Sequence, residues 1–578
     1  MFISKVKSGK YYYYRIAETV YKDGKKTTVN LENLGSDAKL RKLYPERNPD
    51  DVARERLEQL KAQAQAHRQV LIQEYDCAKS ISLNIQRSCK GGYLFLQSFY
   101  YRLGLDKVCR EIEKRHHFEY DLNDILSKLI YTRILYPASK LSSFECSKNF
   151  LEQPNFELHD VYRALEIIAE ENYRIQEAVY RQSQKIVKRN TKILYYDCTN
   201  YFFEIEQESG SKKYGYSKEH RPNPIIQMGL FLDGSGLPLA FSLSPGNTNE
   251  QTTRIPLEKR ILEDFELSKF LVCTDAGLSS LSNRQFNTRG GRGYITTQSL
   301  KKLKAHLKEW ALDPQGWHLA GSSARFDLRK VDLEDPKEQD RIYYKKRWIC
   351  EDGLEQKMLV SFSPKYRKYL RTVRGRQIER AKSRIETPSK LKQKHKNDPN
   401  RFIRVVSATA EGELAEIEMY DLDEQAISQE EIYDGFYAVC SNLEGSELDI
   451  LEINRQRWQI EAAFRTLKLE FEARPVYLQR EDRILAHFTT CFLSLLIYKL
   501  LEQSLKQHCP DADYTMFDVL DTLRNMDFFL LGNQGYSPAY KRTQITDNLH
   551  EIVNFRTDYE GISNKGMKEI LKQSKKNM

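Results

Sequence analysis

Short apolar runs separated by turns begin at residue 191, and their order constrains the fold of this 578-residue chain more than any other feature. The runs are rich in Ile, Leu, Val, Tyr and Phe, which favour strands. The predicted strands are residues 193–196, 225–232, 237–243, 270–274 and 293–297, with a helix at 250–265 after the third. Three adjacent strands, a helix and further strands predict an α/β fold, a mixed sheet flanked by helices.

The sequence on either side of these strands has a different pattern. Residues 1–35 alternate apolar and polar side chains around two turns, which predicts a three-stranded β-meander. Residues 50–188 contain few Gly and Pro and show long helical patterns. The predicted domains are a β-meander (1–45), a helical domain that is a candidate for DNA binding (46–188), the first part of an α/β core (189–299), a basic β-rich insertion (300–434), the second part of the core (435–508) and a C-terminal helical region with a frayed basic tail (509–578).

The positive charge of the chain is concentrated in one segment. The whole chain carries +10, whereas fifteen Lys and Arg against three carboxylates give residues 365–404 a surplus of +12. A local excess of this kind is expected of a nucleic-acid contact. Four lysines of the segment are candidates for DNA binding: Lys390, Lys392, Lys394 and Lys396. A solvated linker helix and loop is the alternative, since charge runs are often only solvated.

A helix is predicted at residues 454–468, which lack Gly and Pro and are rich in helix-forming side chains. Its charged residues fall on one face at helical spacing: Arg457, Glu461, Arg465 and Lys468. An adjoining stripe of Ile460, Ala463 and Leu467 would seat the helix on a core. The charged face is either solvated and paired by salt bridges, or a carboxylate among cations that faces phosphate.

The cysteines and apolar segments indicate a reducing compartment and no membrane. Ten cysteines occur singly, without a Cys-x-x-Cys pair, so neither a zinc site nor a disulfide framework is expected. The first ten residues lack the apolar core of a signal peptide. The longest apolar run, residues 491–501, is about half a membrane span. We therefore expect a cytoplasmic protein, associated with the nucleoid when bound to DNA.

Three carboxylates are candidates for catalysis. Asp197 and Asp275 each follow an apolar run of the predicted sheet, and Glu461 lies on the basic helix. Functional groups collect at the carboxyl ends of strands in α/β folds. Converging carboxylates need a cation to offset their repulsion, and oxygen-only ligands select Mg²⁺ or Mn²⁺ over zinc. Each Asp alone is more simply a strand-end or turn cap, but the three together predict a catalytic metal site.

Three motifs carry a resemblance to a known family. They are Tyr-Tyr-Asp-Cys-Thr-Asn at 195–200, Cys-Thr-Asp-Ala-Gly at 273–277 and Arg457-x3-Glu461-x6-Lys468. With this spacing the chain resembles bacterial insertion-sequence transposases of the DDE type. It is most similar to the IS-four-like group, which has a Tyr-Arg-Glu-Lys signature around the catalytic Glu. The signature Tyr is replaced by Asn454, which can hydrogen-bond a phosphate but cannot stack on a base.

The resemblance implies a fold and a set of residue roles. It implies an RNase H-like catalytic core, interrupted before the Glu helix by a β-rich insertion. Asp197, Asp275 and Glu461 would hold two Mg²⁺ ions, for which Mn²⁺ can substitute. Residues expected to contact DNA are Arg457, Lys468, Arg465, Trp458 and Asn454. Trp458 could stack on a displaced base, although a Trp beside an apolar stripe more often packs on the core, and we favour that packing.

The function implied is that of a DNA transposase. It would cleave the inverted-repeat ends of its element and join them to target DNA, and a homodimer is expected on the paired ends of double-stranded DNA. One alternative is an RNase H-like nuclease or resolvase that cleaves without strand transfer. A second alternative is a domesticated transposase that only binds DNA as a regulator.

Overall fold

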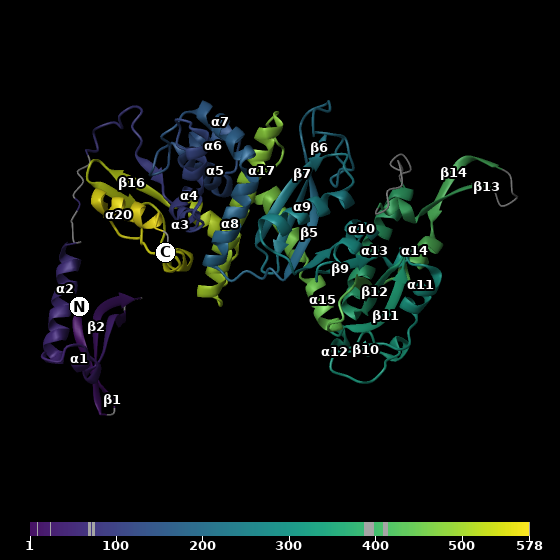
Figure 1. The fold of residues 1–578 in the computed structure, drawn as a ribbon, viewed down its shortest axis with the longest axis horizontal. Coiled ribbons are helices and arrows are strands. Elements are labelled where there is room, and N and C mark those ends of the chain that lie inside the picture. The colour runs from purple at the N-terminus through teal and green to yellow at the C-terminus, as the bar shows by residue number, and fades with distance from the viewer. Residues whose placement is uncertain are drawn as a thin grey trace. The chain divides into compact units, whose positions relative to one another are not determined.

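The computed structural model describes residues 1–8, 10–22, 25–66, 71, 76–386, 398–408 and 414–576 (Figure 1). The chain forms two compact units. The smaller unit contains Met1–Cys89, Met526–Arg542 and Phe555–Gln573. The larger unit contains Lys90–Asn525, Thr543–Asn554 and Ser574–Met578.

The smaller unit contains the β-meander expected at the N-terminus. Strands β1 (Phe2–Ser8), β2 (Tyr11–Lys22) and β3 (Lys25–Ser36) are antiparallel in the order β1-β2-β3. Helices α1 (Asp37–Leu43) and α2 (Pro49–Ala66) follow, and Tyr14, Leu40 and Ala53 form a small core between sheet and helices. Apolar and polar side chains therefore alternate along residues 1–35 because helices cover one face of this sheet.

The C-terminal part of the smaller unit differs from its prediction. A second sheet has the order β18-β17-β16-β4, formed by Ile562–Ser563, Gly535–Pro538, Asp527–Leu531 and Ser88–Lys90, and β17 is antiparallel to both of its neighbours. The basic end of the chain, expected to be frayed, forms helix α20 (Asn564–Ser574). Met567 and Ile570 of α20 are buried, so an apolar stripe between the lysines holds the helix in place.

A nine-stranded mixed sheet is the centre of the larger unit, in the order β10-β11-β12-β15-β9-β8-β5-β6-β7. Strand β8 pairs in parallel with both β5 and β9, and the remaining pairs are antiparallel. The strands are β5 (Ile193–Phe202), β6 (Ile225–Asp233), β7 (Pro238–Pro245), β8 (Leu271–Thr274), β9 (Gly293–Gln298), β10 (His318–Leu319), β11 (Tyr343–Glu351), β12 (Leu354–Phe362) and β15 (Phe436–Ser441). The mixed α/β architecture expected from the sequence is confirmed.

Helices cover both faces of the β5–β8 region. Helix α9 (Glu250–Asp264) packs on the face that carries Tyr196 and Cys198 of β5. Tyr195, Asp197 and Tyr201 alternate with them and therefore point to the other face. On that face α16 (Trp458–Arg465) contacts β5 and β6. Asp197, a carboxylate within a buried strand, therefore lies on the face that α16 covers.

The helical part of the larger unit is packed around one long helix. The short helices are α3 (Tyr93–Arg102), α4 (Leu105–His116), α5 (Leu122–Leu135), α6 (Lys140–Ser147), α7 (Leu158–Glu170) and α8 (Asn172–Ile186). Helix α17 (Glu481–His508) runs beside α5 and α7 and also contacts β7 (Figure 1). By length and apolarity α17 could cross a membrane, but most of its apolar segment is buried inside the protein, which is typical of a core helix.

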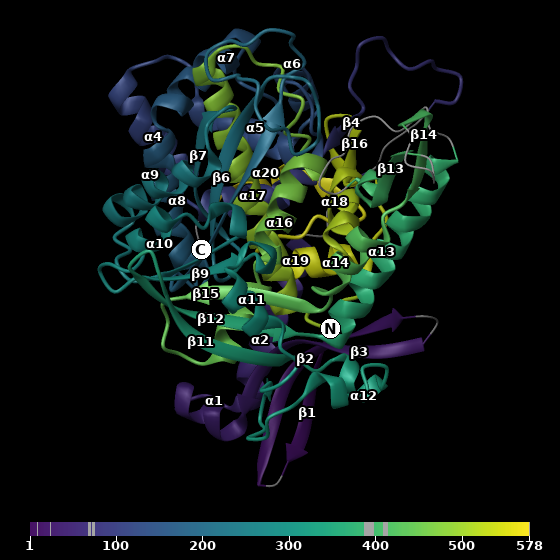
Figure 2. The same ribbon diagram turned by 90° about the vertical axis from the view of Figure 1, so that its right-hand side faces the viewer.

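Residues 300–434 share the sheet of the core, although the sequence sets them apart as an insertion. Strands β11 and β12 form a hairpin, and β12 pairs with β15, so the sheet continues from β9 through β15 into this region (Figure 2). The remaining elements are α11 (Ala305–Leu312), α12 (Pro336–Gln339), α13 (Pro364–Ile385), β13 (Ile403–Ala408), β14 (Leu414–Leu422) and α14 (Glu424–Glu431). Strands β13 and β14 form a separate two-stranded ribbon.

Candidate active site

Asp197 and Asp275 lie side by side on neighbouring strands. Strands β5 and β8 are parallel, and the last pair in their register is Tyr196 with Thr274, so each Asp is the next residue. Adjacent strands are about 4.8 Å apart, which brings the two carboxylates to the same level of the sheet. Asp275 leaves the sheet as the residue before a 3₁₀ turn, and its side chain is 47% exposed.

Asp197 does not end its strand, which corrects the sequence prediction. Strand β5 continues to Phe202, because residues 198–202 pair with β6. Asp197 is thus a half-buried carboxylate inside a strand, and its Oδ1 accepts a 2.8 Å hydrogen bond from its neighbour's backbone, the Cys198 N–H. Burial raises the pKa of Asp197 to about 6, against the opposing effects of Lys218, the Cys198 N–H and Arg457.

Glu461 lies near Asp275, on a helix that is shorter than predicted. The single helix expected at 454–468 is wrong: α15 (Glu447–Arg455) ends first, α16 follows, and Thr466–Glu470 form a π-helical turn. The apolar stripe is confirmed, since Ile460, Ala463 and Leu467 are fully buried. Glu461 lies on the opposite side of α16, with 56% of its side chain exposed.

Arg457, at the joint between α15 and α16, connects the carboxylates. Its Nη2 lies 3.4 Å from Asp275 Oδ1 and 3.6 Å from Glu461 Oε1, and its own side chain is only 15% exposed. It also acts electrostatically on Asp197. Asp275 and Glu461, 186 residues apart in sequence, thus flank one guanidinium group, and Asp197 lies within its electrostatic reach.

Lys468 lies in the π-helical turn, on the side of Asp197. Its Nζ is 3.2 Å from Glu219 Oε1 and 5.6 Å from the centre of the Tyr201 ring. Burial lowers the pKa of Lys468 to about 8; nearby Lys218 lowers it further, while Asp197 raises it. Lys468, which is expected to contact DNA, thus lies within the electrostatic field of Asp197.

The other predicted DNA contacts have different surroundings. Asn454 is buried, and its Nδ2 donates a 3.2 Å hydrogen bond to the Tyr437 hydroxyl, so its amide is used inside the protein rather than presented to a phosphate. Trp458 is 57% exposed, which corrects the expectation that it packs on the core. Arg465 is exposed on α16. The four lysines Lys390, Lys392, Lys394 and Lys396 lie outside the described residues.

The segment that connects β5 and β6 contributes acidic and basic residues near Asp197 that were not predicted from the sequence. Lys218 donates a hydrogen bond to the Cys198 carbonyl, and Glu219 pairs with both Lys468 and Arg474. Their signal in the sequence is the stretch Ser217-Lys218-Glu219, a charged loop directly between two buried strands. No periodicity distinguishes such a loop from a solvated one.

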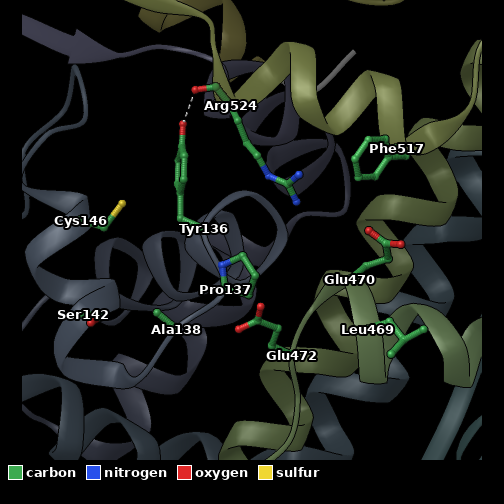
Figure 3. Close-up of a pocket in the computed structure, with 10 residues that line it drawn as sticks. All are labelled: Tyr136, Pro137, Ala138, Ser142, Cys146, Leu469, Glu470, Glu472, Phe517 and Arg524. Atoms are coloured by element: carbon green, nitrogen blue, oxygen red, sulfur yellow. Dashed lines mark hydrogen bonds between the residues drawn. The ribbon is translucent and has the colours of Figure 1, made fainter.

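A separate cavity lies behind the π-helical turn. It has a volume of about 520 Å³ and is lined by Tyr136, Pro137, Ala138, Ser142, Cys146, Leu469, Glu470, Glu472, Phe517 and Arg524. Figure 3 shows the Tyr136 hydroxyl donating to the Arg524 carbonyl, at 3.0 Å, with the carboxylates of Glu470 and Glu472 below. None of the three clustered carboxylates lines this cavity, so it is not part of their site.

The carboxylate cluster has the donor set of a divalent metal site. All three groups offer oxygen only, and two of them are about half exposed and open to solvent. Such ligands suit Mg²⁺ or Mn²⁺. One guanidinium shared between carboxylates leaves oxygen lone pairs free, so the residues present fit a hard cation.

Comparisons with known proteins give one family and seven matching chains of solved structures. The model of the transposase DDE domain matches residues 201–356 and 354–497, just over half of the 578 residues. Asp275 and Glu461 fall inside the match, and Asp197 precedes it by four residues. No curated protein sequence matches the chain.

Two of the matching solved structures are described here, and both have low similarity to this chain. One is a piggyBac transposase synaptic complex with hairpin DNA, 11% identical over 83% of this chain and 90% of that chain, with a TM-score of 0.37. The other is a Mos1 transposase paired-end complex with the left transposon end, 10% identical over 43% of this chain and 68% of that chain, with a TM-score of 0.13.

Proposed function

This chain belongs to the family of the transposase DDE domain, and on that premise we propose that it cleaves the inverted-repeat ends of an insertion sequence and transfers them to target DNA. One observation carries the proposal. Asp197 and Asp275, adjacent on parallel strands, and Glu461 on α16 lie around Arg457. Carboxylates brought together on neighbouring strands and a covering helix suit metal-assisted phosphoryl transfer.

The strand order supports an RNase H-like core. Strands β7-β6-β5-β8-β9 form a continuous part of the sheet, with β6 antiparallel and β8 parallel to β5. In this arrangement Asp197 occupies the middle strand and Asp275 its parallel neighbour. The spacing of Arg457, Glu461 and Lys468 supports the IS-four-like group. Asn454, which replaces the signature Tyr, binds the hydroxyl of Tyr437, so a tyrosine still stands near Arg457.

The proposed chemistry uses Asp197, Asp275 and Glu461 as the ligands of two Mg²⁺ or Mn²⁺ ions. Bound there, the ions would lower the pKa of the attacking water or 3′-hydroxyl and neutralise charge on the leaving oxygen. The residues of the chain hold and orient the reacting groups. Arg457 separates Asp275 from Glu461 and limits their repulsion, while exposed Trp458 and Arg465 lie on the same helix for contact with the DNA strand.

Double-stranded DNA is the proposed partner, and helix α13 supports it. Lys368, Arg376 and Arg380 are exposed on α13, and none of them forms an ion pair with a residue that the structure describes. The opposite side of the helix is fixed by Arg374, whose guanidinium binds both oxygens of Asp434. A firmly anchored helix thus presents free cations along about 18 Å, enough to follow several phosphates.

A cleavage and joining assay tests the function. Purified protein is incubated with Mg²⁺, labelled element-end DNA and a supercoiled plasmid. Joined products are expected; nicked ends without joining would support a nuclease or resolvase, and binding without cleavage would support a DNA-binding regulator. Asp197→Asn, Asp275→Asn or Glu461→Gln should reduce cleavage at least about a hundredfold, because metal stabilisation is worth several kcal/mol.

The matched control for these variants is Glu452→Gln. Glu452 is an exposed carboxylate on α15 that pairs with Arg455, away from the cluster. It should cleave like the wild type. Cleavage near the wild-type rate in any of the three cluster variants would contradict the assignment.

A further inference from the structure

The connection between β5 and β6 is fixed against the strand that carries Asp197. Asn200 of β5 donates a 3.0 Å hydrogen bond from Nδ2 to the Tyr216 carbonyl. The hydroxyl of Ser217 accepts from the backbone N–H groups of Glu219 and Arg221, at 3.3 and 3.2 Å. The backbone on both sides of Lys218 is therefore held in place, and the lysine is not a freely solvated loop residue.

Lys218 directs its ammonium group to the catalytic strand. Its Nζ donates to the carbonyl of Cys198, the residue after Asp197, and lies 3.2 Å from Glu250 Oε1 at the start of α9. Asp197 and Glu250 together raise the pKa of Lys218 against the opposing effect of its burial. The side chain remains 35% exposed, so a ligand can reach it.

Lys468 approaches the same region from the π-helical turn, 250 residues later in the chain. Its Nζ donates to Glu219, the residue directly after Lys218, at 3.2 Å, so both lysines lie beside the strand that carries Asp197, and the charge of Lys218 disfavours that of Lys468. Two ammonium groups in the same half-buried region are unfavourable unless an anion lies near them. Glu219 neutralises Lys468 only in part, because Arg474 shares its carboxylate.

The charged groups around Lys218 and Lys468 include more cations than carboxylates. The cations are Lys218, Lys468, Arg221 and Arg474, and the carboxylates that face them are Asp197, Glu219 and Glu250. If Asp197 serves as a metal ligand, only two carboxylates remain for four cations. A phosphodiester carries one negative charge and two free oxygens, which is what a pair of ammonium groups can bind.

We propose that Lys218 and Lys468 form one phosphate-binding site beside Asp197, which takes a single phosphodiester of the DNA strand at the element end. This proposal rests on the proposed function, which identifies the bound DNA as the element end. It assigns a role to Lys218 and joins two parts of the chain that meet only in the fold. A purely structural ion-pair network is the competing explanation, and it requires no DNA.

The test measures affinity for element-end DNA in EDTA, so that cleavage plays no part. A neutral methylphosphonate replaces each phosphate in turn across the end, in duplexes offered to the wild type, Lys218→Met and Lys218→Arg. The wild type should lose about tenfold in affinity at one position, the size of a single charge-assisted contact and equal to about 1.4 kcal/mol. Lys218→Met should bind the unmodified end about tenfold more weakly and lose nothing further at that position.

The charge-conserving Lys218→Arg should recover most of the affinity and the sensitivity at that position. Lys213→Gln is the matched control, since Lys213 lies in the same loop and pairs with Glu208; it should behave like the wild type. Thermal unfolding of each variant shows that it is folded. The proposal is overturned if Lys218→Met stays as sensitive to methylphosphonate as the wild type at every position. Ends that are bound but not cut in Mg²⁺ would contradict the proposed function alone, because this measurement needs no cleavage.

Discussion

Arg457 is the residue on which the geometry of the carboxylate cluster depends. Its guanidinium lies within 4 Å of both Asp275 and Glu461. Two carboxylates that contact the same guanidinium repel each other, and the cation between them lowers that repulsion. The same cation also competes with any divalent metal for the carboxylates, so Arg457 both assembles the site and limits its affinity for metal.

Replacing Arg457 separates these two effects. Arg457→Gln should bind Mg²⁺ several-fold more tightly, measured by calorimetry without DNA, because a competing charge is lost. Its cleavage of element ends should fall at least about tenfold, because Glu461 is no longer held. Arg455→Gln is the control, since Arg455 is exposed and pairs with Glu452 on the same segment. Weaker Mg²⁺ binding by Arg457→Gln would contradict this account.

A buried lysine in the helical part gives a pH dependence of stability. Lys140 on α6 is buried near Arg133, His487 and Cys491, and burial lowers its pKa to about 7 from 10.5. Between pH 7 and 10.5 the unfolded chain binds the proton that the folded chain excludes, so this residue makes stability rise with pH through that window. Below pH 7 its destabilising effect is complete and constant.

Lys140→Met should therefore stabilise the protein most near pH 7, and the gain should shrink as the pH approaches 10. Urea unfolding at several pH values, followed by circular dichroism, measures the difference from the wild type. Lys148→Met is the control, because Lys148 is exposed at the end of the same helix and pairs with Glu145. A gain that does not change with pH would show that Lys140 titrates normally in the folded protein.

At the scale of elements, helix α13 has one anchored side and one cationic side. Arg374, Ile378 and Ala381 hold it to the protein. Its exposed cations divide into two groups. Lys365, Arg371 and Lys382 are paired with Asp340, Asp434 and Glu379, whereas Lys368, Arg376 and Arg380 form no ion pair with any described residue.

The unpaired group is expected to bind DNA. Replacing Lys368, Arg376 and Arg380 together with Ala should weaken duplex binding and reduce the slope of log K against log salt by about 2–3, at about 0.9 for each lost phosphate contact. Fluorescence anisotropy over a range of salt concentrations measures the slope. The paired cations Lys365 and Lys382, replaced in the same way, should change it by less than about 1. Equal slopes for both variants would mean that α13 is only a solvated helix.

At the scale of the whole molecule, the proposed reaction needs two element ends held together. Asp197, Asp275 and Glu461 form one proposed catalytic site in each chain, so two ends require two chains. We expect a homodimer on paired ends. Light scattering of the protein mixed with end duplexes should give a mass of two chains and two duplexes. A complex of one chain with one duplex at every mixing ratio would contradict the expected dimer.

Local patterns in the sequence contain a large part of this architecture. The alternation of residues 1–35, the apolar runs of β6 and β8 and the stripe on α16 each result from a face that is buried, so periodicity reveals them. Asp197, Asp275 and Glu461 are predicted from the sequence because a charged residue after an apolar run, or on a basic helix, stands out from its neighbours.

The tertiary structure decided what depends on contacts between distant residues. The length of β5 beyond Asp197 is set by pairing with β6, and the joint that positions Arg457 interrupts a segment with uniform helix propensity. The extension of the core sheet into residues 300–434 follows from β12 meeting β15. Lys468 meets Glu219, the residue next to Lys218, across about 250 residues of sequence. Sequence spacing reports which face of an element is buried, but the identity of the partner across that face exists only once the chain has folded.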